Sequence, residues 1–213
     1  MINSFPTVYP ILDSSVIPAN GRAEFLHRLA ASLTDAGVTL LEYRNKTATD
    51  AQLLTDAEVL RRAMPSGLVK LILDDRADLV DRVGFDGVHV DAGDVSPREA
   101  RRLVGPDRIV GTFGGSDSLV PGVLSEPADY FSIGPVFATT TKQTDKAPIG
   151  VQGVRKLRSQ AGPKVVLVAV AGITLETAPL VLAVGATTVA VAAALFANQD
   201  PAAEFRRWFS VLG

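Results

Sequence analysis

Residues able to bind an anionic phosphate follow a short apolar run in the stretch Ala128–Gln143, which reads ADYFSIGPVFATTTKQ. The apolar run Tyr130–Ile133 ends at a Gly134-Pro135 break, and Thr139–Thr141 and Lys142 follow it. Hydroxyls, backbone N–H groups and one ammonium group are the donors that a phosphate needs. If the run is a strand of a parallel sheet, these donors lie at its carboxyl end, where ligands bind in such folds.

Charged residues stand at the ends of other apolar runs. Glu42, Arg44 and Lys46 alternate along LEYRNK, so their side chains point the same way if the strand geometry persists. Four further acidic residues and a histidine stand at or just after the ends of the next two runs, namely Asp74, Asp75, His89, Asp91 and Asp94. If the runs are neighbouring parallel strands, all these groups face one mouth.

This set of residue types indicates a site for Mg²⁺ and a polyphosphate. Carboxylates, water and phosphate oxygens form the hard-oxygen shell that Mg²⁺ prefers, and the cations around it can hold the phosphates. Gly172, ahead of Thr174, is predicted to present backbone N–H groups at a helix N-terminus, as a second phosphate seat. No Ser–His–Asp or Cys–His arrangement is visible in the sequence.

Simpler explanations exist for the same residues. Asp74-Asp75 could cap a helix that opens at Arg76, and Arg44 and Lys46 could be a solvated strand end paired with Glu42. The threonines could belong to an ordinary surface loop. We interpret His89 as a packed, hydrogen-bonded histidine rather than a metal ligand, and His27 as part of an amphipathic helix.

The elements that must position these residues alternate along the chain. Eight β-branched runs are predicted as strands: Val8–Leu12, Leu40–Arg44, Val69–Asp74, Gly87–Val90, Arg108–Phe113, Tyr130–Gly134, Val165–Ala171 and Thr187–Ala193. Amphipathic stretches between them are predicted as helices: Arg22–Ala36, Asp50–Ala63, Arg76–Val83, Ser96–Val104, Val151–Gln160, Leu175–Val184 and Pro201–Val211. The segment Ser118–Glu126 is the weakest helix, because Pro121 and Gly122 lie inside it.

Eight alternations predict an α/β fold, a compact (β/α)₈ TIM barrel that forms a single domain over residues 1–213. The rival is an open doubly wound sheet. That fold ordinarily uses fewer strands, and the first strand-to-helix turn, Leu12-Asp13-Ser14-Ser15, lacks the glycine-rich dinucleotide fingerprint.

Bulk composition excludes several classes of function. The chain has 213 residues, 47% of them apolar, no cysteine and a formal net charge of −2, so disulfides, thiol catalysis and general attraction to nucleic acid are not expected. The start MINSFPTVYP does not look like a secretion signal, and the uncharged segment 177–199 is interrupted by Gly185, so we expect a cytoplasmic protein without a membrane span. The sequence leaves the oligomeric state open, a homo-oligomer included.

Several segments resemble the thiamine phosphate synthase family, within the larger group that also contains thiazole tautomerases. They are EYRNK at 42–46, LILDDRADL at 71–79, DGVHVDAGD at 86–94, ADYFSIGPVFATTTK at 128–142 and VAVAGITLETAPLVLAVGATTVAV at 168–191. GPVFATTTK is the most specific of them, and the order of the segments also fits.

The resemblance implies a transferase that joins hydroxymethylpyrimidine diphosphate to thiazole phosphate and releases pyrophosphate through a carbocation-like step. It implies Asp75 and Asp94 as Mg²⁺ ligands, and Arg44, Lys46 and Lys142 as the cations that neutralise the leaving group. The substrate contacts that it implies are Glu42, Asp74, Thr112, Thr139, Thr141, Gly172, Ala192 and Ala193.

Five positions depart from the family pattern. Glu42 stands for a glutamine, Asp74 for an asparagine, Phe113 for a serine, Ala171 for a glycine and Ala193 for a serine. The alternatives are a thiazole tautomerase, a non-catalytic phosphate-binding relative and an unrelated barrel aldolase or isomerase. A tautomerase would need a histidine after the fifth strand, and GTFGGSDS has none.

Overall fold

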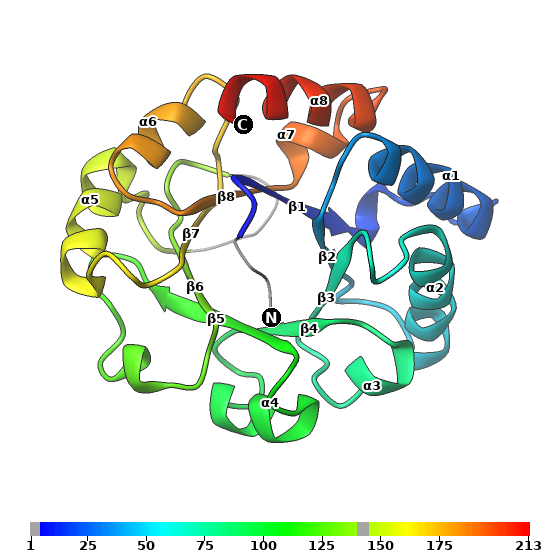
Figure 1. Cartoon of the computed structure of the whole chain (residues 1–213), viewed down its shortest axis with the longest axis horizontal. Coiled ribbons are helices and arrows are strands. Elements are labelled where there is room, and N and C mark those ends of the chain that lie inside the picture. The colour runs from blue at the N-terminus through cyan, green and yellow to red at the C-terminus, as the bar shows by residue number, and fades with distance from the viewer. Residues whose placement is uncertain (1–4, 140–144) are drawn as a thin grey trace.

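A closed barrel of parallel strands forms the centre of the computed structural model, which describes residues 5–139 and 145–213 (Figure 1). The strands are β1 (Val8–Asp13), β2 (Leu40–Arg44), β3 (Lys70–Asp74), β4 (Gly87–Val90), β5 (Ile109–Gly115), β6 (Tyr130–Ile133), β7 (Leu167–Val170) and β8 (Thr188–Val191). They pair in chain order, and β8 closes on β1. The predicted (β/α)₈ barrel is confirmed.

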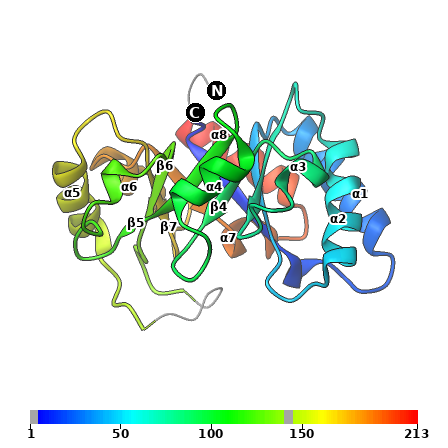
Figure 2. The same cartoon turned by 90° about the horizontal axis from the view of Figure 1, so that it is seen from below.

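Helices surround the barrel on all sides (Figure 1). They are α1 (Arg22–Asp35), α2 (Asp50–Ala63), α3 (Val80–Val83), α4 (Pro97–Val104), α5 (Gly150–Ala161), α6 (Ala178–Ala183), α7 (Ala193–Phe196) and α8 (Pro201–Leu212), with two 3₁₀ turns, η1 (Ser14–Val16) and η2 (Val123–Ser125). The side view shows the strand-to-helix loops at one end of the barrel and the C-terminus at the other (Figure 2).

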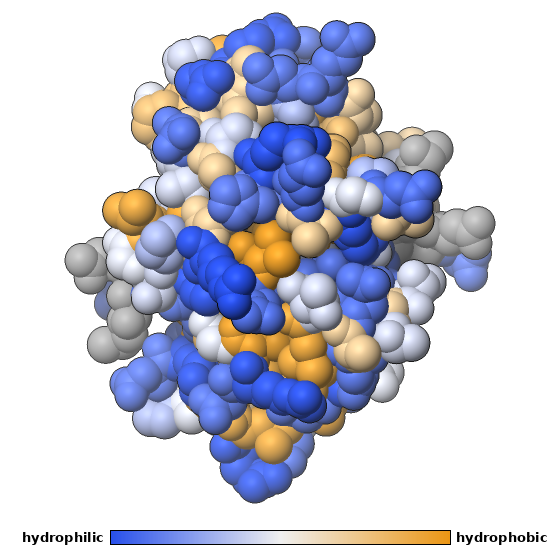
Figure 3. Space-filling model, turned by 90° about the vertical axis from the view of Figure 1, so that its right-hand side faces the viewer, coloured by the Kyte–Doolittle hydropathy of each residue, from blue (hydrophilic) through white to orange (hydrophobic). Residues whose placement is uncertain are grey.

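Two apolar clusters make up the core, because successive strand residues point to opposite faces. The larger lies between the barrel and the helices, and the smaller fills the barrel interior with Tyr9, Leu40, Ile72, Ile109, Tyr130, Val168 and Ala190. Gly111 makes room for this filling, because a Cβ there would collide with the Tyr130 ring. The outer face over α1 and α2 is mostly polar, with a few apolar side chains between the polar ones (Figure 3).

The helix after β3 is shorter than predicted. Asp75 has φ 67°, in the left-handed region, and its N–H donates to the His89 carbonyl at 2.8 Å. The chain therefore turns between strand and helix, and α3 begins only at Val80. The predicted helix start at Arg76 is wrong, and the alternative explanation of Asp74-Asp75 as the cap of that helix falls with it.

The segment after β7 also differs from the prediction. A turn over 174–177, in which the Thr177 hydroxyl accepts from the Thr174 N–H at 2.9 Å, precedes α6 at Ala178. Gly172 therefore lies in the loop before this turn, and α6 begins only after the turn. The prediction that Gly172 stands at a helix N-terminus is wrong.

Two further boundaries are corrected. β8 ends at Val191, and Ala193 opens the short helix α7, which the sequence pattern did not predict because alanine and valine continue without a break. The weak helix expected over Ser118–Glu126 is reduced to the 3₁₀ turn η2, as Pro121 and Gly122 suggest.

Candidate active site

A cavity of about 680 Å³ opens at the carboxyl ends of the strands. Seven of the predicted site residues line it: Glu42, Arg44, Asp74, Thr139, Gly172, Ala192 and Ala193. They come from β2, β3, the loops after β6 and β7 and the start of α7 after β8, so closing the barrel brings together segments that are far apart in the sequence. This position is where barrel enzymes carry their active sites.

The two cations of β2 and the loop after it meet carboxylates. The Lys46 Nζ lies 2.8 Å from Asp74 Oδ2 and also pairs with Asp75. Arg44 pairs with Asp13, and its Nε lies 3.6 Å from Asp74 Oδ2. Arg44 and Lys46 therefore both lie against Asp74, and of these two cations Arg44 lines the cavity itself. Burial raises the pKa of Asp74, although the positive charge of Lys46 opposes this shift.

Asp75 and Asp94 bring two carboxyl groups within hydrogen-bonding reach of each other. Burial, and then the proximity of Asp75, raises the pKa of Asp94, whose Oδ2 accepts from the Asp91 N–H at 2.8 Å. Asp75 Oδ1 is buried and makes no hydrogen bond within the described ranges. Over those same ranges, no group of three or more His, Cys, Asp or Glu side chains could hold a metal ion by itself.

A chain of buried polar side chains forms the floor of the cavity. Tyr9 donates its hydroxyl proton to Glu42 Oε2 at 2.7 Å and lies 3.1 Å from the Tyr130 hydroxyl. His89 Nδ1 lies 3.0 Å from that same Tyr130 oxygen, and its ring stacks on Tyr130. His89 is thus packed and hydrogen-bonded, as the sequence interpretation had it.

The electrostatics of this floor favour a charged histidine. Burial raises the pKa of Glu42 to about 7. Burial alone would lower the pKa of His89, but the hydrogen bond to Asp91 and the negative charge of Glu42 outweigh it and raise that pKa to about 9. Near neutral pH the His89 ring is therefore protonated on both nitrogens and positively charged inside the barrel.

Beyond the ends of β6, β7 and β8, the cavity is lined mostly by small residues. Gly172 has φ 67°, and a Cβ on it would meet the backbone of Ala138 and Phe137. The Phe137 N–H donates to the Ala171 carbonyl at 3.1 Å, which ties the loops after β6 and β7 together. Thr139, Ala192 and Ala193 line the same cavity as Gly172, and we call these four residues the small-residue seat.

Other predicted residues lie elsewhere. Thr112 donates its hydroxyl to the Val90 carbonyl at 3.0 Å and lines, together with Asp94, a separate pocket of about 400 Å³. It therefore lies outside the cavity that the other candidates line. Thr141 and Lys142 fall outside the residues that the structure describes.

Sequence reasoning missed Lys146 as a cavity residue. Its Nζ lies 3.8 Å from the centroid of the Phe113 ring, and both side chains line the cavity. In the sequence, Phe113 stands out only because the family pattern has a serine at this position. A lysine that follows the threonine loop was the available signal for Lys146, but only the fold shows that β5 brings an aromatic ring beneath it.

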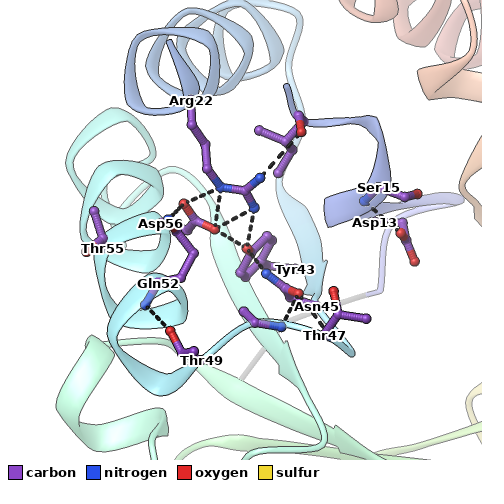
Figure 4. A network of polar contacts seen from close by, with 12 residues as sticks. Asp13, Ser15, Arg22, Tyr43, Asn45, Thr47, Thr49, Gln52, Thr55 and Asp56 are labelled. Carbon is purple, nitrogen blue, oxygen red and sulfur yellow. Dashed lines mark hydrogen bonds and ion pairs between the residues drawn. The ribbon is translucent and has the colours of Figure 1, made fainter. Parts of the chain in front are cut away.

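The loop between β2 and α2, which carries Lys46, is joined to a buried polar network (Figure 4). Arg22 donates from Nε and Nη2 to Asp56, which is 1% exposed, and Tyr43 donates its hydroxyl to the same carboxylate. Asn45 Nδ2 donates to the Tyr43 oxygen at 2.8 Å. The network links α1, α2 and the end of β2.

A sequence model of a known family, described as thiamine monophosphate synthase, matches residues 8–195. The chain belongs to the thiamine monophosphate synthase family. It is thus a member of a transferase family, and the barrel, the cavity and the motif segments of this synthase family all fall within the matched range.

Relatives support this assignment over most of the chain. The thiamine-phosphate synthase of Koribacter versatilis is 38% identical over 201 residues, 94% of each chain, and that of Rhodospirillum centenum is 41% identical over 177 residues, 82% of this chain and 83% of the relative. Among solved structures, a thiamine phosphate pyrophosphorylase from Pyrococcus furiosus superposes with a TM-score of 0.78 at 25% identity, covering 97% of this chain and 95% of that one.

Barrel enzymes of other kinds share only the fold with this family member. A 3-hexulose-6-phosphate synthase, for example, gives a TM-score of 0.64 at 15% identity over 97% of this chain and the whole of the other. Within residues 5–139 and 145–213, none of the helices has the length and apolar character needed to span a membrane.

Proposed function

We propose that this protein is a thiamine-phosphate synthase that couples hydroxymethylpyrimidine diphosphate with thiazole phosphate. The C–O bond to the diphosphate breaks, and its electron pair leaves with pyrophosphate. The thiazole nitrogen then forms the new C–N bond to the pyrimidine methylene carbon. The observation that carries the proposal is the single cavity in which Arg44, Asp74, Thr139 and Gly172 meet. Lys46 pairs with the cavity residue Asp74 and with Asp75, and Asp94 lies beside Asp75 on the side of the neighbouring pocket.

Asp75 and Asp94 are the residues that we propose to hold Mg²⁺. Two carboxyl groups this close repel each other when both are ionised, at a cost of about 4 kcal/mol for charges 4 Å apart at an effective dielectric constant near 20. The buried Asp75 Oδ1, which has no hydrogen bond in the described chain, fits the donor set of a hard divalent cation. Bound there, Mg²⁺ would neutralise negative charge on the diphosphate.

The charge balance around the cavity supports a metal in addition to the cations. Four carboxylate residues line the cavity, Asp13, Glu42, Asp74 and Asp91, with Asp75 and Asp94 beside them. Arg44 and Lys46 are already paired with some of these and the charged His89 offsets another, so a diphosphate entering this mouth needs more positive charge. Lys146, and Lys142 on the resemblance, would add to it.

The remaining roles follow from position. Arg44 and Lys46 would stabilise charge that builds on the leaving oxygens as the C–O bond breaks. The small-residue seat at Gly172, Thr139 and the loop after β8 would receive the thiazole phosphate. We place the protein in the cytoplasm, and a chain without cysteine is compatible with that reducing compartment.

The test is a turnover assay with hydroxymethylpyrimidine diphosphate, thiazole phosphate and Mg²⁺, in which pyrophosphate and thiamine phosphate are measured together. We expect equal amounts of both products and none in the presence of EDTA. Pyrophosphate without thiamine phosphate would indicate hydrolysis instead.

Binding measurements separate the alternatives if no product forms. Thiazole phosphate that binds by calorimetry without turnover would identify a non-catalytic relative and contradict the proposal. Isomerisation of the thiazole without coupling would identify a tautomerase, although the described residues of the loop after β5 include no histidine for that chemistry.

A further inference from the structure

Lys46 lies in an irregular loop, so its position needs an explanation beyond strand geometry. β2 ends at Arg44 and α2 begins at Asp50. The Lys46 side chain is 34% exposed, yet its ammonium group meets both Asp74 and Asp75. A long, flexible side chain on a free loop would lose considerable conformational entropy in this geometry.

Asn45 fixes the turn in which Lys46 stands. Its Oδ1 accepts from the backbone N–H of Thr47 at 3.3 Å and of Ala48 at 3.0 Å. These bonds close a side-chain turn of the kind that asparagine favours, with Lys46 at its corner. The direction in which Lys46 leaves the backbone therefore depends on the orientation of the Asn45 side chain.

The orientation of the Asn45 side chain is set in turn by buried residues of β2 and α2. Its Nδ2 donates to the Tyr43 hydroxyl at 2.8 Å, and Tyr43 donates its own proton to Asp56. The Asp56 carboxylate is buried and also accepts from Arg22 Nε at 2.9 Å and from Gln52 Nε2 at 2.9 Å. Figure 4 shows these side chains pointing toward one another between the helices and the end of β2.

We propose that the buried Arg22–Asp56 pair is a positioning pair for Lys46 and acts on it through Tyr43 and Asn45. A buried ion pair is often no more stabilising than apolar residues of the same volume, so stability alone does not account for it. The pair instead fixes the position of Lys46, because hydrogen bonds lead from Asp56 through Tyr43 and Asn45 to the turn that carries this lysine. The consequence for turnover rests on the proposed function, whereas the positioning itself does not.

The direct test is chemical labelling of lysine in the Tyr43→Phe variant. Phenylalanine keeps the buried ring but removes the hydroxyl that links Asp56 to Asn45. We expect limiting acetic anhydride to label Lys46 about fivefold faster than in the wild type, as the loss of one positioning hydrogen bond implies. Mass spectrometry of peptides gives the rate for each lysine.

Lys70 is the internal control, because it is also ion-paired, at 3.0 Å from Asp86, and lies at the start of β3. Its labelling should not change in Tyr43→Phe. Thr55→Ala is the matched variant, since Thr55 loses only a hydrogen bond to Ala51 on the exposed side of α2. It should label like the wild type. If Lys46 keeps its rate in Tyr43→Phe, or if Lys70 accelerates equally, the proposal is wrong.

A double-mutant cycle connects positioning to function. Inhibition by inorganic pyrophosphate with Mg²⁺ is measured for the wild type, Tyr43→Phe, Lys46→Met and the double variant. We expect Tyr43→Phe to weaken inhibition about fivefold in the wild type and not at all in the Lys46→Met background. An equal loss in both backgrounds would assign Tyr43 a general structural role. If the wild type shows no turnover, the proposed function fails, and the labelling result still decides the positioning.

Discussion

At the scale of single residues, the mouth of the barrel holds more carboxyl groups than the positively charged side chains around it can neutralise. Lys46 pairs with Asp74 and Asp75, and Arg44 pairs with Asp13. Asp94 accepts from the Asp91 N–H and lies beside the Asp75 carboxyl group, and the positive charge of Lys46 offsets this proximity only in part. The pKa shifts of Asp74 and Asp94 point the same way, toward the neutral acid. A divalent cation held by Asp75 and Asp94 would neutralise the repulsion between these carboxylates.

Asp94→Asn tests that assignment. Asparagine can still accept from the Asp91 N–H but carries no charge, so the fold should persist. We expect the Mg²⁺ concentration for half-maximal turnover to rise about tenfold, which corresponds to about 1.4 kcal/mol of metal binding. Glu99→Gln, on the exposed side of α4, is the control and should behave like the wild type. An unchanged Mg²⁺ response in Asp94→Asn would rule out the metal assignment.

His89 makes stability depend on pH in a definite direction. Its pKa is about 9 in the folded protein against an ordinary value of 6.5, so the folded state binds more protons between these values. This contribution is fully present below pH 6.5 and is lost as the pH rises through 9. We expect the free energy of unfolding to fall by up to about 3 kcal/mol over that range, as measured by urea titration at several pH values.

Glu42→Gln provides the matched comparison. Glutamine still accepts from Tyr9 but removes one of the negative charges that raise the pKa of His89. The fall in stability above pH 6.5 should therefore become smaller. If stability falls with pH as steeply in this variant as in the wild type, the charge of Glu42 does not raise the pKa of His89.

At the scale of elements, the loop between β7 and α6 depends on one glycine. Gly172 is left-handed, and a Cβ at this position would strike the backbone of the loop after β6. Gly172→Ala should therefore displace the two loops from each other and raise the KM for thiazole phosphate at least about tenfold, leaving the KM for the diphosphate substrate nearly unchanged. Steady-state kinetics with each substrate varied in turn measures this, and equal changes in both KM values would contradict it.

The element boundaries show what periodicity could and could not predict. Strand β2 and helix α2 have the predicted bounds, because alternating and helical patterns are clear there and Thr49 accepts from the Gln52 N–H as a cap. Helix α3 begins later than predicted because Asp75 adopts a left-handed conformation, which its sequence neighbours do not signal. That conformation is supported by a hydrogen bond to His89 on β4, a contact between strands.

At the scale of the whole molecule, closure of the barrel brings the first and last elements together. β1 pairs with β8, and α8 packs against α1 and β1 with Trp208 buried. Trp208→Ala should lower the free energy of unfolding by about 3–5 kcal/mol, as judged by urea denaturation, because it leaves a large cavity at this seam. Its neighbour Phe209 is 60% exposed, so Phe209→Ala should change stability by less than about 0.5 kcal/mol. Similar losses of stability in both variants would contradict the role of the buried Trp208 in joining the first and last elements.

The sequence by itself determined the kind of barrel and the charged residues at its strand ends, since alternation of strands and helices is a local property of the chain. The resemblance of its motif segments also pointed to the correct family. The tertiary structure alone decided which of these residues meet. It placed Thr112 outside the cavity, moved Gly172 from a helix end to a loop and added Lys146 over Phe113. It also joined Lys46 to a buried pair on α1 and α2. Such contacts depend on loop paths and on packing between distant segments, which local sequence patterns do not encode.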